Sequence, residues 1–144
     1  MPSKDLLTKK QEQQVIEAIQ EAEKRTSGEI RIHIEQSSDQ EPLQRAAYIF
    51  HELGMDQTTL QNGVLIYIAD EDHQAAIYAG KGIHEQVEDD YWSTILDQLI
   101  AHFKKQEFEQ GIEETVRRVG QKLADLFPPD GRATNELSDE ISYT

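Results

Sequence analysis

The sequence contains no cysteine and no long uncharged run of apolar residues. The missing cysteine excludes disulfides, thiolate metal sites, iron–sulfur clusters and thiol nucleophiles, so any bound metal would have oxygen or imidazole ligands. A membrane-spanning helix needs about 20 consecutive apolar residues, and the first ten residues are polar and charged, unlike a signal sequence. We therefore expect no membrane insertion and a cytoplasmic location.

Basic residues are also scarce, with 14 Lys and Arg against 28 Asp and Glu and a net charge of -14. Phosphate backbones and anionic lipids are bound by Lys and Arg, so we expect no nucleic-acid partner. A length of 144 residues suits one domain. The sequence predicts a single domain over residues 1–127, ended by Pro128 and Pro129, and a polar, mobile tail over residues 128–144.

Hydrophobic periodicity predicts the order helix, strand, helix, strand, strand, helix, helix. Residues 29–36 alternate isoleucine with polar side chains, which is typical of a strand with one solvated face at the edge of a sheet. Residues 64–69 form an unbroken apolar run, which indicates a central strand covered on both faces. The expected helices span about 8–25, 42–53, 92–103 and 108–127, and the third strand spans 74–80.

This order predicts an α/β protein, a three-layer α/β/α sandwich around a small mixed sheet with a Rossmann-like arrangement. A right-handed crossover makes the first two strands parallel, and a hairpin makes the third strand antiparallel. The starts of the first two strands, at Glu29 and Asn62, then meet the end of the third strand, at 80–82, on one sheet edge. We expect Glu88, Asp89 and Asp90 to join Glu29 there.

Such a cluster of carboxylates predicts a site for a hard divalent cation, because like charges repel until a cation neutralises them. The candidate metal ligands share oxygen donors and are Glu29, Asp89, Asp90, Asn62 and, through its carbonyl, Gly82. Structural alternatives remain for each of them. Asp89 or Asp90 would also cap the following helix, Glu29 would also suit a solvated strand end, and Asn62 with Gly63 would also form a turn.

Two further groups of possible ligands lack the spacing of known metal motifs. Residues 70–72 begin like an EF-hand loop but lack its glycine and distal glutamate, so they indicate a solvated hairpin tip. The five histidines are scattered without the spacing of a zinc motif. His33 is expected on the solvated face of the first strand, and His84 alone lies near the proposed pocket in sequence.

Several segments in order resemble the TPM domain family over residues 8–127, with a further likeness at residues 135–137. They are Thr26-Ser27-Gly28-Glu29-Ile30-Arg31-Ile32, Arg45-Ala46-Ala47, Asn62-Gly63-Val64-Leu65-Ile66-Tyr67, Gly80-Lys81-Gly82-Ile83 and Asp89-Asp90-Tyr91-Trp92. The resemblance implies an α/β/α sandwich, calcium or a similar divalent ion in an acidic pocket, and an association with acid phosphatase activity. Members with a membrane anchor work in photosystem repair or modulate a receptor.

Two functions remain open at this point. One is a stand-alone module that binds calcium or magnesium and acts on another protein. The other is a metal-assisted acid phosphatase acting on a small phosphorylated molecule. A phosphatase needs at least one Lys or Arg side chain close to the metal to bind the phosphate. Only Lys81, Arg31 and Arg45 are candidates for this role. No nucleophile with a partner base is evident in the sequence, so we place binding ahead of catalysis.

Overall fold

A four-stranded mixed sheet in the order β3-β2-β1-β4 forms the centre of the protein. The computed structural model describes residues 6–58, 60–88, 90–129 and 141–144. Strand β1 (Glu29–Glu35) pairs in parallel with β2 (Gly63–Ala69), and β3 (Gln74–Ala79) returns antiparallel beside β2. The predicted crossover and hairpin are confirmed. A short fourth strand, β4 (Ser142–Tyr143), pairs in parallel with β1.

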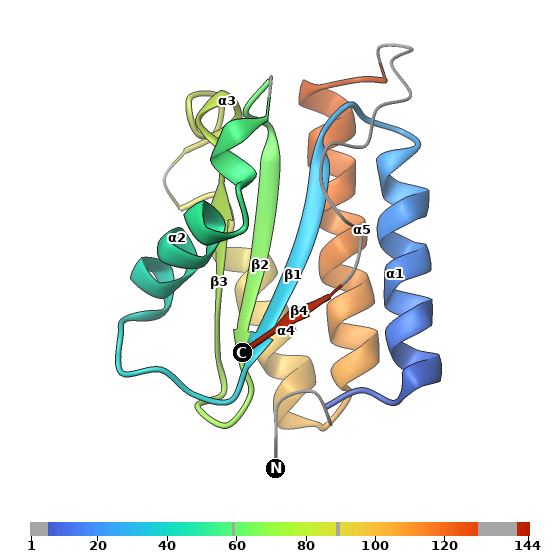
Figure 1. Cartoon of the computed structure of the whole chain (residues 1–144). Helices are drawn as coiled ribbons and strands as arrows, with labels where there is room; N and C mark the ends of the chain where they lie inside the picture. Colours follow the sequence, from blue (N-terminus) through green and yellow to red (C-terminus); the bar gives the residue numbers. More distant parts are fainter. Residues whose placement is uncertain (1–5, 59, 89, 130–140) are drawn as a thin grey trace.

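Helices cover both faces of the sheet, as the three-layer prediction requires (Figure 1). Helices α1, α4 and α5 lie on one face, while α2 and a short 3-10 turn, η2, lie on the other. The short α3 follows β3 directly. The bounds are α1 Lys9–Glu23, α2 Pro42–Glu52, η2 Met55–Gln57, α3 Lys81–His84, α4 Ser93–Lys104 and α5 Phe108–Leu126.

The sheet separates two hydrophobic cores. The larger core joins the isoleucines of β1 to α1, α4 and α5, and the smaller core packs α2 against β2 and β3. All seven residues of β2 are buried, which confirms the central strand expected from its apolar run. No helix of the described residues is long and apolar enough to cross a membrane.

The position of β1 differs from the sequence-based expectation. Strand β1 lies between β2 and β4 and is not at the sheet edge. Three of its polar side chains point toward the α2 side but are buried, with exposed fractions of 6% for Glu29, 2% for His33 and 4% for Glu35. The expected solvated face was wrong because partners far away in sequence cover these side chains.

Residues 141–144 lie against the sheet, although the sequence predicts them as part of a polar, mobile tail. Ile141 is buried in the larger core, and Ser142–Tyr143 forms β4. The backbone N–H of Thr144 donates to the carbonyl of Ile34 at 3.3 Å. Residues 141–144 are therefore part of the sheet, and residues 130–140 of the predicted tail lie outside the described residues.

Candidate functional site

The amino-terminal end of the parallel strands brings Glu29 and Asn62 together. Glu29 opens β1 opposite Gly63, the first residue of β2, and its N–H donates to the carbonyl of Asn62 at 3.3 Å. Both side chains are buried, at 6% and 3% exposure. The amide of Asn62 donates to the hydroxyl of Ser27 at 3.4 Å. This backbone hydrogen bond confirms the predicted meeting of the two strand starts.

The end of β3 packs tightly against the same loop. The N–H of Gly80 donates to the carbonyl of Gly63 at 2.8 Å, and the N–H of Gly82 donates to the carbonyl of Gln61 at 2.9 Å. A Cβ on Gly80 would lie 2.4 Å from the oxygen of Gln61, and one on Gly82 would lie 2.6 Å from the oxygen of Leu60. Glycine is required at both positions because backbone approaches backbone here.

Replacing Gly80 with alanine should therefore destabilise the protein by about 1–3 kcal/mol, the usual effect of overpacking against atoms that cannot yield. Urea unfolding measures this loss. Gly111→Ala is the matched control, since its Cβ would lie 2.7 Å from the Cβ of His102 between α4 and α5. Both variants should lose stability, but only the Gly80 variant should also perturb the amide signals of Glu29 and Asn62. A Gly80 variant as stable as the parent would contradict the close packing.

The loop before α4 holds the other acidic candidates. Asp89 lies outside the described residues, so its predicted role stays a prediction. Asp90 is exposed. The residue that caps α4 is Trp92, and no side-chain cap bond is formed there. Capping of α4 by Asp90, the structural alternative to ligation, is therefore absent from the described structure.

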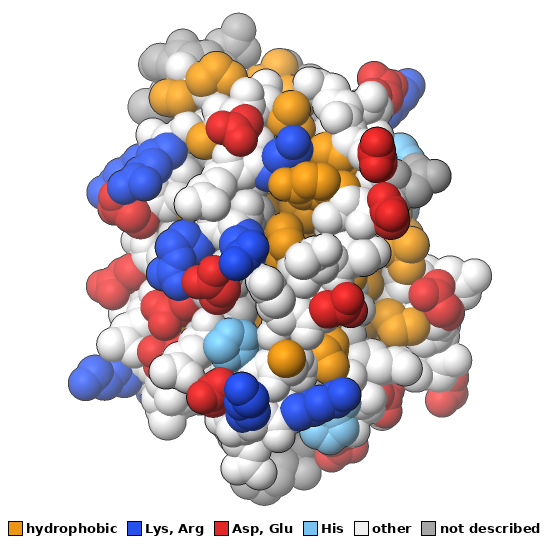
Figure 2. Space-filling model, turned by 180° about the vertical axis from the view of Figure 1, so that it is seen from behind, with side chains coloured by type: hydrophobic (Ala, Val, Ile, Leu, Met, Phe, Trp, Pro, Cys, Tyr) orange, Lys and Arg blue, Asp and Glu red, His pale blue; other side chains and the backbone are white. Residues whose placement is uncertain are grey.

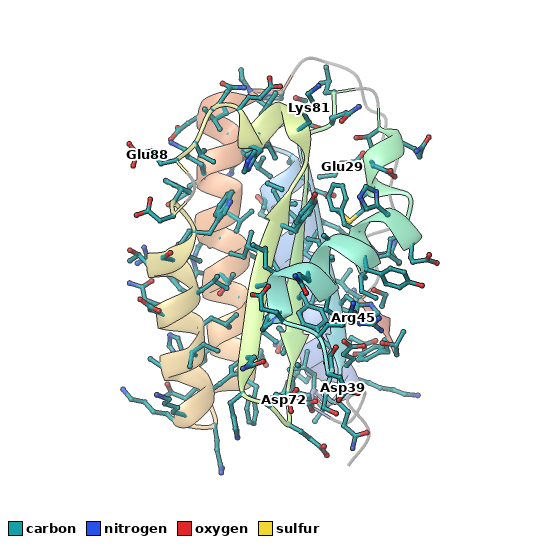
Figure 3. All side chains as sticks on the ribbon, turned by 90° about the vertical axis from the view of Figure 1, so that its left-hand side faces the viewer. Glu29, Asp39, Arg45, Asp72, Lys81 and Glu88 are labelled. Carbon is teal, nitrogen blue, oxygen red and sulfur yellow. The ribbon has the colours of Figure 1, made fainter. Side chains whose placement is uncertain are left out.

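Not all the acidic residues gather as expected. In Figure 3 Glu29 lies on the α2 side of the sheet, whereas Glu88 lies on the α4 side and points away from it. Among residues 6–58, 60–88, 90–129 and 141–144, no three Asp, Glu or His side chains form a group able to hold a metal. The described part of the site provides Glu29, Asn62 and backbone carbonyls. The carbonyl of Gly82, a predicted ligand, accepts a hydrogen bond from the Gln86 amide at 3.0 Å.

A second polar cluster, which the sequence analysis missed, lies at the other end of β1. The carboxylate of Glu35 accepts two hydrogen bonds from Arg45, at 2.9 and 3.0 Å, and further bonds from the hydroxyls of Tyr67 and Thr144. Burial alone would raise the pKa of Glu35, but these hydrogen bonds outweigh it and lower the pKa to about 2. Arg45 is therefore committed to Glu35 and does not reach the Glu29 end of the strand.

His33 belongs to the same cluster and is not on a solvated face. Its Nδ1 is hydrogen-bonded to the hydroxyl of Ser142 at 2.7 Å and its Nε2 to that of Thr144 at 2.9 Å. Burial lowers the pKa of His33 to about 4, opposed by the charge of Glu35. The sequence signal for this cluster was the alternation of polar side chains along β1, which also fits a solvated strand.

The charged side chains of the hairpin tip and of the helical face make surface contacts. The carboxylate of Asp72 accepts the N–H of Ser38 at 3.1 Å, which gives the tip a structural contact. It lies at the opposite end of the sheet from Glu29 (Figure 3). Figure 2 shows acidic and basic side chains intermingled on the face formed by α1, α4 and α5. Arg117 and Arg118, for example, both pair with Glu114.

Comparison with known proteins adds three findings. The family model of the TPM domain matches residues 2–122. The BA42 protein of the psychrophilic bacterium Bizionia argentinensis, solved by NMR, is 43% identical, with a TM-score of 0.88 over 96% of this chain and 95% of that one. No curated protein matches this chain.

Two more distant solved structures share the fold. An N-terminal domain from P. gingivalis is 22% identical, with a TM-score of 0.70 over 85% of this chain and 79% of that one. The N-terminal domain of the cg2496 protein of Corynebacterium glutamicum is 13% identical, with a TM-score of 0.63 over 96% of this chain and 80% of that one. At these identities the likeness concerns the fold.

Proposed function

The chain belongs to the TPM domain family, and from that premise we propose that it binds a divalent cation at the Glu29 end of the sheet and acts through another protein. The observation that carries the proposal is that Glu29 and Asn62 are both buried where the two strands begin, and that the Glu29 N–H donates to the Asn62 carbonyl. Their side chains supply carboxylate and amide oxygens, the ligands that hard cations prefer. Asp89 and Asp90, the predicted ligands in the loop before α4, are proposed to supply further negative charge, although Glu88 in the same loop lies on the α4 side (Figure 3).

Calcium suits this donor set better than magnesium. Calcium accepts about six to eight oxygen ligands in a flexible geometry that includes backbone carbonyls, whereas magnesium demands an octahedron and retains several waters. Only two side chains of the described site, those of Glu29 and Asn62, are buried oxygen donors, and the neighbouring loop is held by backbone contacts to Gly80 and Gly82. A donor set that mixes a carboxylate, an amide and backbone carbonyls suits the ion with the more flexible coordination.

A metal-assisted phosphatase is the second candidate. It needs a Lys or Arg side chain near the metal to hold the phosphate. The ion pair of Arg45 with Glu35 removes one of the three basic candidates. Lys81 remains, exposed at the start of α3 at the same sheet end as Glu29 (Figure 3), together with Arg31 two residues along β1. A net charge of -14 also repels an anionic substrate. Binding is therefore the first proposal, and the cytoplasmic location stays a prediction.

Calorimetric titration with calcium and with magnesium tests the proposal. The parent should bind one calcium more tightly than magnesium, and the Asp89→Asn, Asp90→Asn double variant should lose at least tenfold in affinity. The matched control is Asp70→Asn, Asp72→Asn, which removes the same charge from the hairpin tip and should bind like the parent. Trp92 is 8% exposed and lies two residues beyond Asp90, so its fluorescence should report ordering of the loop.

If neither ion binds the parent at millimolar concentration, the cation proposal is wrong. Turnover of p-nitrophenyl phosphate by the calcium-loaded parent, lost in Lys81→Ala, would instead favour the phosphatase.

A further inference from the structure

Residues 141–144 contact β1, α1 and the larger core. Ile141 is buried in the larger core, and the hydroxyl of Ser142 contacts His33 at 2.7 Å. The hydroxyl of Tyr143 donates to the carboxylate of Glu12 on α1 at 2.5 Å. Alternate side chains therefore point to opposite faces of the sheet, and the two on the face toward α2, Ser142 and Thr144, bind through their hydroxyls.

Thr144 makes the most concentrated set of contacts. Its hydroxyl donates to Glu35 at 2.7 Å and lies 2.9 Å from Nε2 of His33, while its N–H donates to the carbonyl of Ile34. Backbone pairing supplies affinity for any extended chain, and pockets for alternate side chains supply selectivity, which is how peptides add a strand to a sheet edge.

Three polar side chains of β1 and β2 are buried near β4. His33, Glu35 and Tyr67 are buried to 2%, 4% and 0% exposure. A buried polar group is stable only when its hydrogen bonds are made, so this row discriminates strongly against an apolar strand that would leave it unpaired. The hydroxyls of Ser142 and Thr144 satisfy that requirement at positions two residues apart.

We propose that the edge of β1 is a binding site for an extended peptide of a partner protein, with the pattern apolar, Ser or Thr, aromatic, Ser or Thr. Residues 141–144 carry this pattern and occupy the site as an internal ligand. The inference rests on the interaction role proposed above but not on the cation, since β4 pairs with His33 and Ile34, away from Glu29.

The pairing of β4 is short enough to be displaced. Only two residue pairs join it to β1, His33 with Ser142 and Ile34 with Tyr143. An internal ligand lowers the apparent affinity for an external one by the fraction of time the site is occupied. The partner would therefore bind the parent chain weakly and would bind a chain with a released segment strongly.

A peptide titration on the full-length chain tests this inference. The probe is a fluorescent, N-acetylated peptide with the sequence of residues 138–144, followed by anisotropy without added metal. The released variant is Ser142→Ala, Thr144→Pro, which removes both hydroxyls and the backbone donor at 144. It should bind the peptide saturably and at least tenfold more tightly than the parent. A peptide with alanine at both hydroxyl positions should bind at least tenfold more weakly.

Three results would overturn the inference. The first is no saturable binding to the released variant at millimolar peptide, and the second is equal binding of the alanine peptide. The third is a parent that is dimeric at micromolar concentration and monomeric after release, which would assign the edge to a second copy. Should the released variant not fold, Thr144→Ala and the amide shifts of Ile32–Ile34 in the parent with excess peptide give the same decision. Calcium titration of the parent is unaffected by any of these outcomes.

Discussion

Replacing Arg45 with alanine is expected to destabilise the protein by about 3 kcal/mol, because it leaves a buried carboxylate without its counter-ion. Glu35 is 4% exposed and receives two hydrogen bonds from the guanidinium of Arg45. The hydroxyls of Tyr67 and Thr144 would remain, but neither carries a positive charge. Urea unfolding at pH 7 measures the loss.

Two controls separate burial from the mere loss of an ion pair. Arg117→Ala removes a pair whose side chains are 65% and 33% exposed, so it should change the free energy of unfolding by no more than about 0.5 kcal/mol. The double variant Glu35→Gln, Arg45→Met removes both charges and should be more stable than Arg45→Ala alone. A loss for Arg45→Ala no larger than that for Arg117→Ala would contradict the buried character of the cluster.

Acidification should lower the free energy of unfolding over two pH ranges, one for each of two groups in the same cluster. The pKa of His33 is lowered from 6.5 to about 4, so the unfolded chain binds this proton more readily and stability falls between pH 6.5 and 4. The pKa of Glu35 is lowered from 4.5 to about 2, so its contribution is present above pH 4.5 and is lost as the pH falls toward 2. Each loss should be on the order of 3 kcal/mol.

Substitution of His33 with glutamine isolates the first stage. Glutamine keeps hydrogen-bonding groups for Ser142 and Thr144 but does not titrate. We expect the unfolding free energy of this variant to be flat between pH 6.5 and 5, where that of the parent falls. Urea unfolding at pH 7, 6 and 5 gives the comparison. Parallel curves for the parent and the variant would mean that His33 is not the group responsible.

The fold was predictable to the extent that hydrophobic patterns are local. The apolar run of β2 and the turn that follows it specify a central strand and a hairpin, and the segment between β1 and β2 is long enough for a helical crossover. The parallel crossover and the hairpin together place Glu29, Asn62 and Gly80 at the same end of the sheet. The structure confirms that end for all three residues.

The polar cluster could not be predicted because its partners are distant in sequence. An alternating strand looks the same whether solvent or Ser142 covers His33, and these two residues are 109 positions apart. The prediction that Glu88 would join Glu29 was wrong for a different reason. Reaching the correct end of a sheet does not determine which face a loop follows, and the chain after β3 turns toward α4 on the face opposite to Glu29 (Figure 3).

Paramagnetic broadening by manganese, followed in the amide spectrum of the full-length chain, tests the cation site most directly. Manganese is a hard divalent cation that occupies oxygen-ligand sites. We predict that substoichiometric manganese broadens the amides of Gly28–Ile30, Gln61–Gly63 and Gly80–Ile83 first, and that excess calcium restores them. Broadening that begins at the hairpin tip, Asp70–His73, or that no calcium concentration reverses, would contradict a divalent-cation site at the Glu29 end of the sheet.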